Sequence, residues 1–268
     1  MPVFLLDQKV IVIVGGTTGL GLSAAHAVLA AGAAGVVVTG RNPESADAAL
    51  SSLGEKAVAH IGDATSPEHA EDAIRLAVGR FGRFDGLYHV AGGSGRRRGD
   101  GPLHEVTDDG IGFTLDLNLH SLILSNRAAV QHFLATGTGG SILNMGSVLG
   151  WSPSPRFFST HVYAAAKSAI IGFTKSIAAC YASKGIRANV IAPALVETPM
   201  AKRAAGDDDI LSFIRTKQPL DGGRIGKPND LDAAVVYFLS DGSAFTTGQV
   251  LAVDGGWTVS EGQIPAGL

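Results

Sequence analysis

The chain has 268 residues, and 46% of them are hydrophobic, which is enough for the core of one large α/β domain. Its net charge of -3 gives no basic field that would gather nucleic acid or anionic lipid, so we expect neither partner. Cys180 is the single cysteine and has no internal disulfide partner, and Met1–Gln8 lacks the marks of a secretory signal. No apolar run reaches the roughly 18 residues of a membrane helix. A cytoplasmic location is therefore expected.

The first elements alternate between strand and helix. Lys9–Val14 is a short β-branched run that predicts a buried strand, and the Ala-rich stretch Leu22–Gly32 has apolar residues at helical spacing. Val36–Thr39 predicts a second strand. Asn42 stands directly before a proline and a glutamate, which is typical of a helix N-terminus, so a second helix is expected through Leu53.

The same alternation continues along the rest of the chain. Strands are expected at Ala57–Ile61, Phe84–Val90, Ser141–Met145, Arg187–Ile191 and Gln249–Val253, with helices starting at Ser66 and spanning Asn118–Phe133 and Tyr163–Ala182. Strands that are apolar without alternation are buried on both faces, which predicts a doubly wound, Rossmann-like parallel sheet of about seven strands. We expect a single domain over 1–268, with mobile substrate loops near 93–101 and 200–223.

A glycine-rich turn separates the first strand from the first helix. Its sequence is Gly15-Gly16-Thr17-Thr18-Gly19-Leu20-Gly21, a G-x-x-x-G-x-G spacing. Glycines let the backbone approach a pyrophosphate, and the helix N-terminus that follows offers free N–H groups and a partial positive charge. The turn could also hold no ligand, but its strand and helix flanks favour a dinucleotide site. The expected cofactor contacts here are Gly15, Thr17, Thr18, Gly19, Leu20 and Gly21.

The end of the second strand bears on the choice of cofactor. NAD-specific folds place a carboxylate there for the ribose 2'-hydroxyl, whereas this chain has Gly40 followed by Arg41. An arginine can hold a 2'-phosphate through a planar pair of hydrogen bonds, so Arg41 favours NADP(H) over NAD(H). The alternative is a surface arginine in a turn. Asp63, just after the third strand, is a candidate contact for the adenine.

Candidate catalytic groups occur in the second half of the chain. Tyr163 and Lys167 lie four positions apart in a helix-forming stretch, so their side chains share one face. An adjacent ammonium favours a phenolate, so we expect a lowered pKa for Tyr163, which would prepare it as general acid or base. Ser147 ends a predicted strand, where ligands gather, and its hydroxyl could bind a substrate oxygen. Asn118 lies inside a predicted helix, where asparagine is unfavourable, so a local irregularity is expected.

These motifs, in this order, resemble those of the short-chain dehydrogenase/reductase family along nearly the whole chain. The resemblance rests on the glycine turn, LDLNLHS, SILNMGS, Tyr163-Ala-Ala-Ala-Lys167 and PALVETPM. It implies hydride transfer between a nicotinamide and a carbonyl or secondary alcohol, with Asn118 completing a proton relay through Lys167. The catalytic residues it implies are Asn118, Ser147, Tyr163 and Lys167, with no metal. Further cofactor contacts are expected from Ala91, Gly92, Tyr163, Lys167, Pro193, Val196 and Thr198, the last of which would bind the nicotinamide carboxamide.

The chain departs from the family pattern without losing a catalytic group. Val14 replaces the usual threonine before the turn, His89-Val90 replaces a pair of asparagines, and Ala194 replaces the glycine after a proline. His89 could bond the main chain as an asparagine would. The stretch between Ser147 and Tyr163 is longer than usual and contains Trp151, Pro153, Pro155, Phe157 and Phe158. Its aromatic residues either shape a pocket for an apolar or ring-containing substrate or belong to the core or a subunit interface.

Three functions are open at this point. The first is reduction of a carbonyl compound or the reverse oxidation, and the second is reduction of a 3-oxoacyl thioester on an acyl carrier. The third is a non-catalytic NADP(H)-sensing protein of the same fold. Arg96, Arg97 and Arg98 could attract a carrier protein or an anionic substrate, or lie in a solvated loop. The long predicted helices and Gln249–Leu268 resemble regions that pair subunits, so a homo-oligomer, a tetramer or a dimer, is expected.

Overall fold

Seven parallel strands form the centre of the structure, a computed structural model that describes residues 5–262. Their order across the sheet is β3-β2-β1-β4-β5-β6-β7, and each neighbouring pair is parallel. The predicted doubly wound sheet is therefore confirmed. The ends of two predicted segments, residues 1–4 and 263–268, lie outside the described residues. The strands are β1 (Val10–Val14), β2 (Gly35–Gly40), β3 (Ala57–Ile61), β4 (Gly86–His89), β5 (Gly140–Met145), β6 (Ile186–Pro193) and β7 (Val250–Val253).

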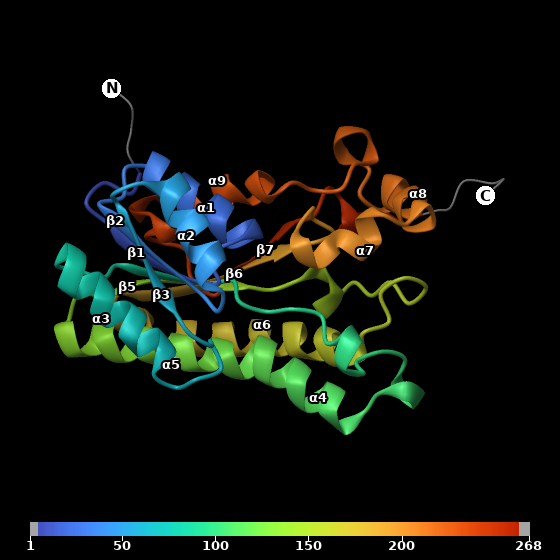
Figure 1. The fold of residues 1–268 in the computed structure, drawn as a ribbon, viewed down its shortest axis with the longest axis horizontal. Coiled ribbons are helices and arrows are strands. Elements are labelled where there is room, and N and C mark those ends of the chain that lie inside the picture. The colour runs from blue at the N-terminus through green and yellow to red at the C-terminus, as the bar shows by residue number, and fades with distance from the viewer. Residues whose placement is uncertain (1–4, 263–268) are drawn as a thin grey trace.

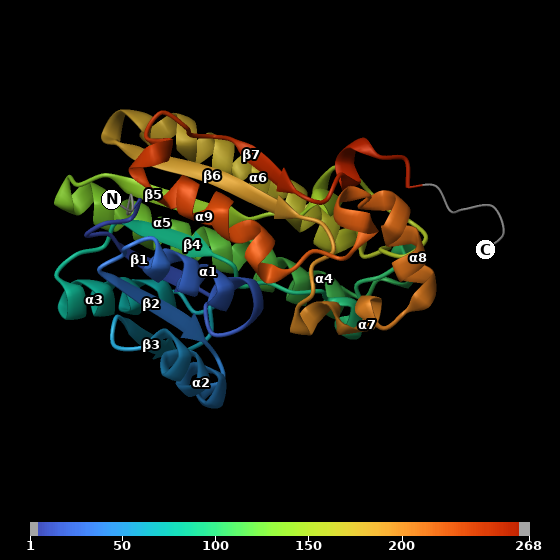
Figure 2. The same ribbon diagram turned by 90° about the horizontal axis from the view of Figure 1, so that it is seen from above.

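Helices cover both faces of the sheet (Figure 1). On one face pack α1 (Gly19–Ala30), α2 (Pro43–Leu53) and α9 (Asp232–Leu239), and on the other α3 (His69–Phe81), α5 (Ser121–Thr136) and α6 (His161–Tyr181). Figure 2 shows α4 (Asp108–Leu115), α7 (Lys202–Ala205) and α8 (Asp208–Lys217) beyond the carboxyl ends of the strands. Within residues 5–262, none of the helices combines the length and apolar character needed to span a bilayer.

The first strand shows why the sheet is buried on both sides. Val10, Val12 and Val14 face the layer of α3, α5 and α6, whereas Ile11 and Ile13 face the layer of α1, α2 and α9. All five side chains are at most 1% exposed. Because successive side chains of a strand point to opposite faces, an unbroken β-branched run supplies both layers of the core. Each such side chain contributes about 1.5–3 kcal/mol on burial.

The segment 200–223 contains two α-helices, α7 and α8. Asp207 caps α8, since its side chain accepts a hydrogen bond from the Ile210 N–H at 3.0 Å. Ile210 and Ile214, one helical turn apart, are buried against Trp257 and its neighbours. The acidic run after Gly206 is therefore a helix start, as the preference of carboxylates for N-termini explains. The mobility expected of this segment and of 93–101, and the single domain over 1–268, remain predictions.

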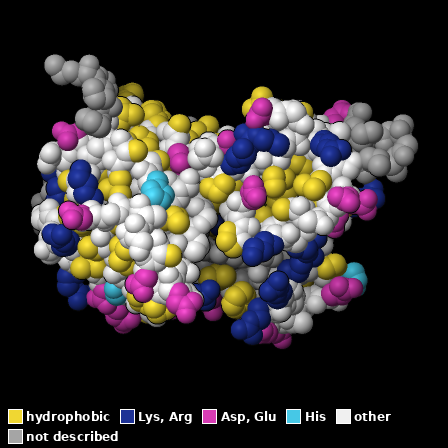
Figure 3. Space-filling view, turned by 45° about the horizontal axis from the view of Figure 1, so that its top comes forward, with side chains coloured by type: hydrophobic (Ala, Val, Ile, Leu, Met, Phe, Trp, Pro, Cys, Tyr) yellow, Lys and Arg dark blue, Asp and Glu magenta, His cyan; other side chains and the backbone are white. Residues whose placement is uncertain are grey.

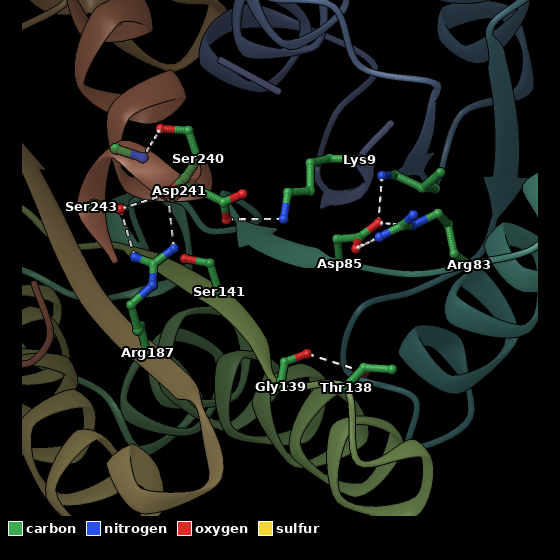
Figure 4. A network of polar contacts seen from close by, with 12 residues as sticks. Lys9, Arg83, Asp85, Thr138, Gly139, Ser141, Arg187, Ser240, Asp241 and Ser243 are labelled. Atoms are coloured by element: carbon green, nitrogen blue, oxygen red, sulfur yellow. Dashed lines mark hydrogen bonds and ion pairs between the residues drawn. The ribbon is translucent and has the colours of Figure 1, made fainter. Parts of the chain in front are cut away.

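A network of polar side chains lies at the amino ends of the strands (Figure 4). Arg187 of β6 donates to the carbonyl oxygens of Phe238 and Ser240, each at 3.0 Å, and so caps the C-terminus of α9. Asp85 accepts from the Val10 N–H at 2.9 Å and pairs with Arg83. The hollow at this edge, about 550 Å³, is therefore lined by charged groups that already have partners, and the network serves the stability of the fold.

Candidate active site

A cavity of about 880 Å³ lies at the carboxyl ends of the central strands, where doubly wound sheets bind ligands. Figure 3 shows it as a hollow between two parts of this face of the molecule. Asn118 and Gly21 lie behind the wall, and the other predicted site residues line the cavity. These are Gly15, Thr17, Thr18, Gly19, Leu20, Arg41, Asp63, Ala91, Gly92, Ser147, Tyr163, Lys167, Pro193, Val196 and Thr198.

The glycine turn has the shape of a phosphate cradle. Gly15 has a φ of +86°, and a Cβ there would lie 2.7 Å from the Ala91 nitrogen, so only glycine fits. Gly21 packs directly behind it, because a Cβ at Gly21 would clash with the Gly15 carbonyl oxygen. Among the described residues, no side chain caps α1 through Thr18, and its first turn holds no acid. The free N–H groups and the helix dipole fit the pyrophosphate of a dinucleotide.

Arg41 and Asp63 lie together at one end of the cavity. Arg41 Nη1 is 3.9 Å from Asp63 Oδ2, and both side chains are exposed. Asp63 also accepts hydrogen bonds from the Thr65 N–H at 2.9 Å and the Thr65 hydroxyl at 2.8 Å, and these bonds, with the nearby Arg41, hold the pKa of Asp63 below its usual value. Arg41 is therefore free to turn toward another anion without leaving the carboxylate unpartnered.

Tyr163, Ser147 and Lys167 meet at the other end. The Tyr163 phenol lies beside the hydroxyl of Ser147, which follows β5, and Lys167 lies one turn further along α6. Lys167 is 3% exposed, donates to the Met145 carbonyl oxygen at 2.9 Å and holds its Nζ 5.5 Å from the centre of the Tyr163 ring. The fold thus gathers a phenol, a hydroxyl and an ammonium at one wall of the cavity.

The expected lowering of the Tyr163 pKa is wrong. Burial raises the pKa of Tyr163 to about 12, and the neighbouring Ser147 hydroxyl only partly opposes that rise. Burial also lowers the pKa of Lys167 to about 8. The spacing of Tyr163 and Lys167 indicates the attraction between ammonium and phenolate, but not the cost of removing both groups from water. Lys167 also directs a proton toward Met145 rather than toward the phenol.

Asn118 lies in the irregularity that its position predicted. The helix expected over Asn118–Phe133 begins within a π-helical turn, Asp116–His120, which joins α4 to α5 and in which the Ser121 N–H bonds to the Asp116 carbonyl. The Asn118 side chain is fully buried, accepts from the Gly93 N–H at 3.0 Å and donates to the Gly93 carbonyl at 2.9 Å. Asn118 therefore holds the loop after β4 against the cavity. The π turn that carries it is of a kind that often occurs at functional sites.

Two histidines support the cavity wall. His69, which the sequence analysis missed, lines the cavity and places its Nε2 2.9 Å from the Thr39 hydroxyl, which in turn accepts from the Gly15 N–H at 3.4 Å. His89 is fully buried, and its Nε2 lies 3.0 Å from the Ala91 carbonyl oxygen, the main-chain contact expected of it. Burial lowers the pKa of His89 to about 3, so a neutral ring positions Ala91.

The aromatic residues between Ser147 and Tyr163 have different surroundings. Phe158 lines the cavity and packs 5.7 Å from the Trp257 ring, whereas Phe157 packs on Phe213 at 5.1 Å. Trp151 is 42% exposed. The insertion therefore gives one aromatic side chain to the cavity and one to the core beneath α8.

Asp100 is a further site residue that the sequence did not reveal. It is 1% exposed and accepts hydrogen bonds from the Val162 N–H at 3.1 Å and the Tyr163 N–H at 2.9 Å. Thr160, the residue at the N-cap of α6, makes no side-chain capping bond within the described residues. Asp100 therefore caps α6 from a distant loop and fixes the turn that carries Tyr163.

We predict that Asp100→Ala lowers the free energy of unfolding by about 1–2 kcal/mol, because two buried N–H groups lose their acceptor. The first turn of α6 should then loosen, so kcat should fall more than the affinity for the cofactor. Urea unfolding and steady-state kinetics would measure both effects. Asp109→Ala is the matched control. The Asp109 side chain is 74% exposed, and the substitution removes only its 3.9 Å contact with Arg98. Equal effects of the two substitutions would contradict the capping role.

Comparison with known proteins extends this picture. The family model described as "Enoyl-(Acyl carrier protein) reductase" matches residues 14–258. A 2,5-dichloro-2,5-cyclohexadiene-1,4-diol dehydrogenase of Sphingobium indicum is 32% identical over 94% of this chain and 98% of its own. A cis-4-hydroxycyclohexanecarboxylate dehydrogenase of Sinomonas cyclohexanicum is 32% identical over 94% and 97%. Both names describe enzymes that act on alcohols.

A solved structure agrees with the sequence relatives. A short-chain type dehydrogenase/reductase from Mycobacterium ulcerans superposes with a TM-score of 0.87 at 27% identity, covering 95% of this chain and 91% of the other. Because matches to dehydrogenases extend over nearly the whole chain, the non-catalytic alternative is set aside. The protein belongs to the short-chain dehydrogenase/reductase family and is an oxidoreductase that interconverts a carbonyl and an alcohol by hydride transfer.

Proposed function

We propose that the protein is an NADP(H)-dependent enzyme of this family in which Tyr163 transfers the proton, Ser147 binds the reacting oxygen and Lys167 supports the phenol. The observation that carries the proposal is the gathering of Tyr163 and Ser147 at one wall of the cavity, with the Lys167 ammonium 5.5 Å from the centre of the Tyr163 ring. Asp100 caps the turn that carries Tyr163, and Asn118 holds the neighbouring loop at Gly93.

The chemistry follows from where each proton lies. The bound nicotinamide supplies or accepts the hydride. With a pKa near 12, the Tyr163 phenol is protonated at neutral pH and can donate its proton to the carbonyl oxygen of a substrate. The Ser147 oxygen accepts from the Leu149 N–H at 3.3 Å, and its hydroxyl, which lines the cavity beside the phenol, can donate its own proton to the same substrate oxygen. Lys167 carries its charge below about pH 8 and stabilises the phenolate that remains.

A screen of ketones and secondary alcohols, followed by the absorbance of NADPH, tests the proposal. The relatives named for cyclohexadienediol and hydroxycyclohexanecarboxylate substrates, and the aromatic lining from Phe158 and Trp257, favour cyclic compounds with a ring carbonyl or hydroxyl. We expect turnover of at least one such pair in both directions. Failure to oxidise or reduce any member of a broad panel, with the cofactor shown to bind, would contradict the proposal.

The preference for NADP(H) is tested at Arg41. Arg41→Asp should weaken NADPH binding by about tenfold to a hundredfold, because one charge-assisted pair with the 2'-phosphate becomes a repulsion. Binding of NADH, which has no such phosphate, should change by less than about threefold. Titration of each cofactor by fluorescence gives the two affinities. An equal loss for NADPH and NADH would mean that Arg41 does not contact the phosphate.

A second candidate within the class is reduction of a 3-oxoacyl thioester on an acyl carrier. The name of the matching family model and the arginines at the cavity favour it.

We also propose a homo-oligomer located in the cytoplasm. Exposed apolar side chains on the outer helices and near β7 support self-association, among them Ile111, Leu134, Tyr237, Phe245 and Leu251.

A further inference from the structure

Basic side chains from two distant segments meet at the cavity. Arg96 and Arg97 come from the loop after β4, whereas Lys202 and Arg203 belong to α7, and all four line the cavity. Figure 3 shows Lys and Arg side chains gathered beside the hollow. The net charge of the chain is -3, so this concentration of positive charge is local and opposite in sign to the net charge.

These cations have no acidic partner in the part of the chain that the structure describes. Other arginines pair with carboxylates there, such as Arg41 with Asp63 and Arg98 with Asp109, but no ion pair joins Arg96, Arg97, Lys202 or Arg203 to an acid. The polar contact of the Arg203 guanidinium is with the Phe157 carbonyl oxygen at 3.4 Å. Asp100, the acid near Arg96, is already bound to the N-terminus of α6.

Arg96 and Arg203 are close enough to repel one another. Burial lowers the pKa of Arg96, and the charge of Arg203 lowers it further, while Asp100 opposes both effects. Two like charges held at one wall, one of them partly buried, are unfavourable unless an anion lies between or beside them. The adjoining wall is apolar and includes Leu149, Phe158 and Trp257.

Building on the proposed function, we infer that the substrate is a small carbonyl compound or alcohol with an apolar body and an anionic oxygen group, which Arg96 and Arg203 bind. Guanidinium groups recognise carboxylate, sulfonate and phosphate oxygens through paired hydrogen bonds. Arg96 is partly buried in the cavity wall rather than exposed on the outer surface. A group that enters the cavity therefore fits this site better than the surface of an acidic carrier protein does.

Trp257 provides a way to measure binding without turnover. It is 1% exposed, lines the cavity and packs on Phe158, so its fluorescence should respond to an occupied cavity. The NADP⁺-loaded protein is titrated with cyclohexanecarboxylate, cyclohexanesulfonate and the neutral cyclohexanecarboxamide. We expect the two anions to bind at least about tenfold more tightly than the amide, with an advantage that shrinks as salt is added.

Substitutions assign the effect to particular side chains. Arg96→Gln and Arg203→Gln should each weaken the anions by about tenfold and leave the amide unchanged, while Arg96→Lys should keep part of the affinity. Arg98→Gln is the matched control, since it removes the same charge from the same turn. The Arg98 guanidinium lies over the Phe113 ring at 5.2 Å and beside Asp109, so this variant should bind like the wild type.

The outcomes separate this inference from the proposed function. Equal binding of the anions and the amide, or an equal loss in Arg98→Gln, would overturn the anion site even if the enzyme reduces neutral ketones. Binding of an acidic acyl carrier protein that depends on Arg96, without binding of the small anions, would overturn it in favour of carrier docking. Conversely, anion binding that depends on Arg96 and Arg203 would stand even if Tyr163 proved not to be the proton donor.

Discussion

Replacing Tyr163 by phenylalanine is expected to lower kcat for carbonyl reduction by about 10³-fold and to leave the affinity for the cofactor nearly unchanged. The substitution removes one oxygen, the group that holds the transferable proton at pH 7, well below its pKa of about 12. The ring itself, which packs beside Lys167, stays in place. Steady-state kinetics and a cofactor titration on the same preparation measure the two quantities.

Tyr181→Phe is the matched control for this experiment. Tyr181 lies at the other end of α6 and packs with the core of α3 and α5, away from the cavity. The same chemical change there should leave kcat within about twofold of the wild type. If Tyr163→Phe kept its turnover, or if Tyr181→Phe lost as much, the proton would come from another group and the proposed mechanism would be wrong.

Local sequence patterns were enough to predict the sheet and the cavity. The strand Val10–Val14 is an unbroken β-branched run, the glycine turn follows it directly, and Tyr163 and Lys167 are one helical turn apart. Each of these signals acts over a few residues, so a linear sequence contains it in full. The order of the motifs then indicated the family to which the chain belongs.

Contacts between distant residues could not be predicted in this way. Asp100 is 63 positions from the N–H group of Tyr163 that it caps, and nothing in its own neighbourhood marks it as buried. Arg96 and Arg203 come from different segments, so the repulsion between them appears only in the folded chain. The start of α8 was a local signal that was available, because Asp207 precedes Ile210 and Ile214 at helical spacing, but Gly206 and the acidic run suggested a loop.

The pKa of Tyr163 shows the same limit in energetic terms. Spacing along a helix predicts that an ammonium is near a phenol, but not how much water either group loses on folding. In the structure, burial is the largest influence on both groups and disfavours the charged form of each. At neutral pH the phenol is uncharged in both the folded and the unfolded chain, so the cost in stability falls on the Lys167 charge, and a substitution can measure it.

Lys167→Met is expected to lower kcat by about 10²-fold or more and to raise the free energy of unfolding of the cofactor-free protein by about 2 kcal/mol. Burial lowers the pKa of Lys167 from 10.5 to about 8, which corresponds to about 3 kcal/mol of penalty for the buried charge at neutral pH. Loss of the hydrogen bond to the Met145 carbonyl oxygen offsets about 1 kcal/mol of the gain. Urea unfolding at pH 7 measures the change.

The pH dependence identifies the charge as the cause. Because the folded pKa lies below the unfolded value, the unfolded chain holds the Lys167 proton between about pH 8 and 10.5 while the folded chain has lost it. The unfolding free energy of the wild type should therefore rise across that window relative to Lys167→Met, and the two should converge by pH 10. Lys175→Met, at an exposed position of α6, should change stability by less than about 0.5 kcal/mol. If Lys167→Met were less stable than the wild type at pH 7, the buried ammonium would stabilise the fold, which would contradict the expected cost of burying its charge.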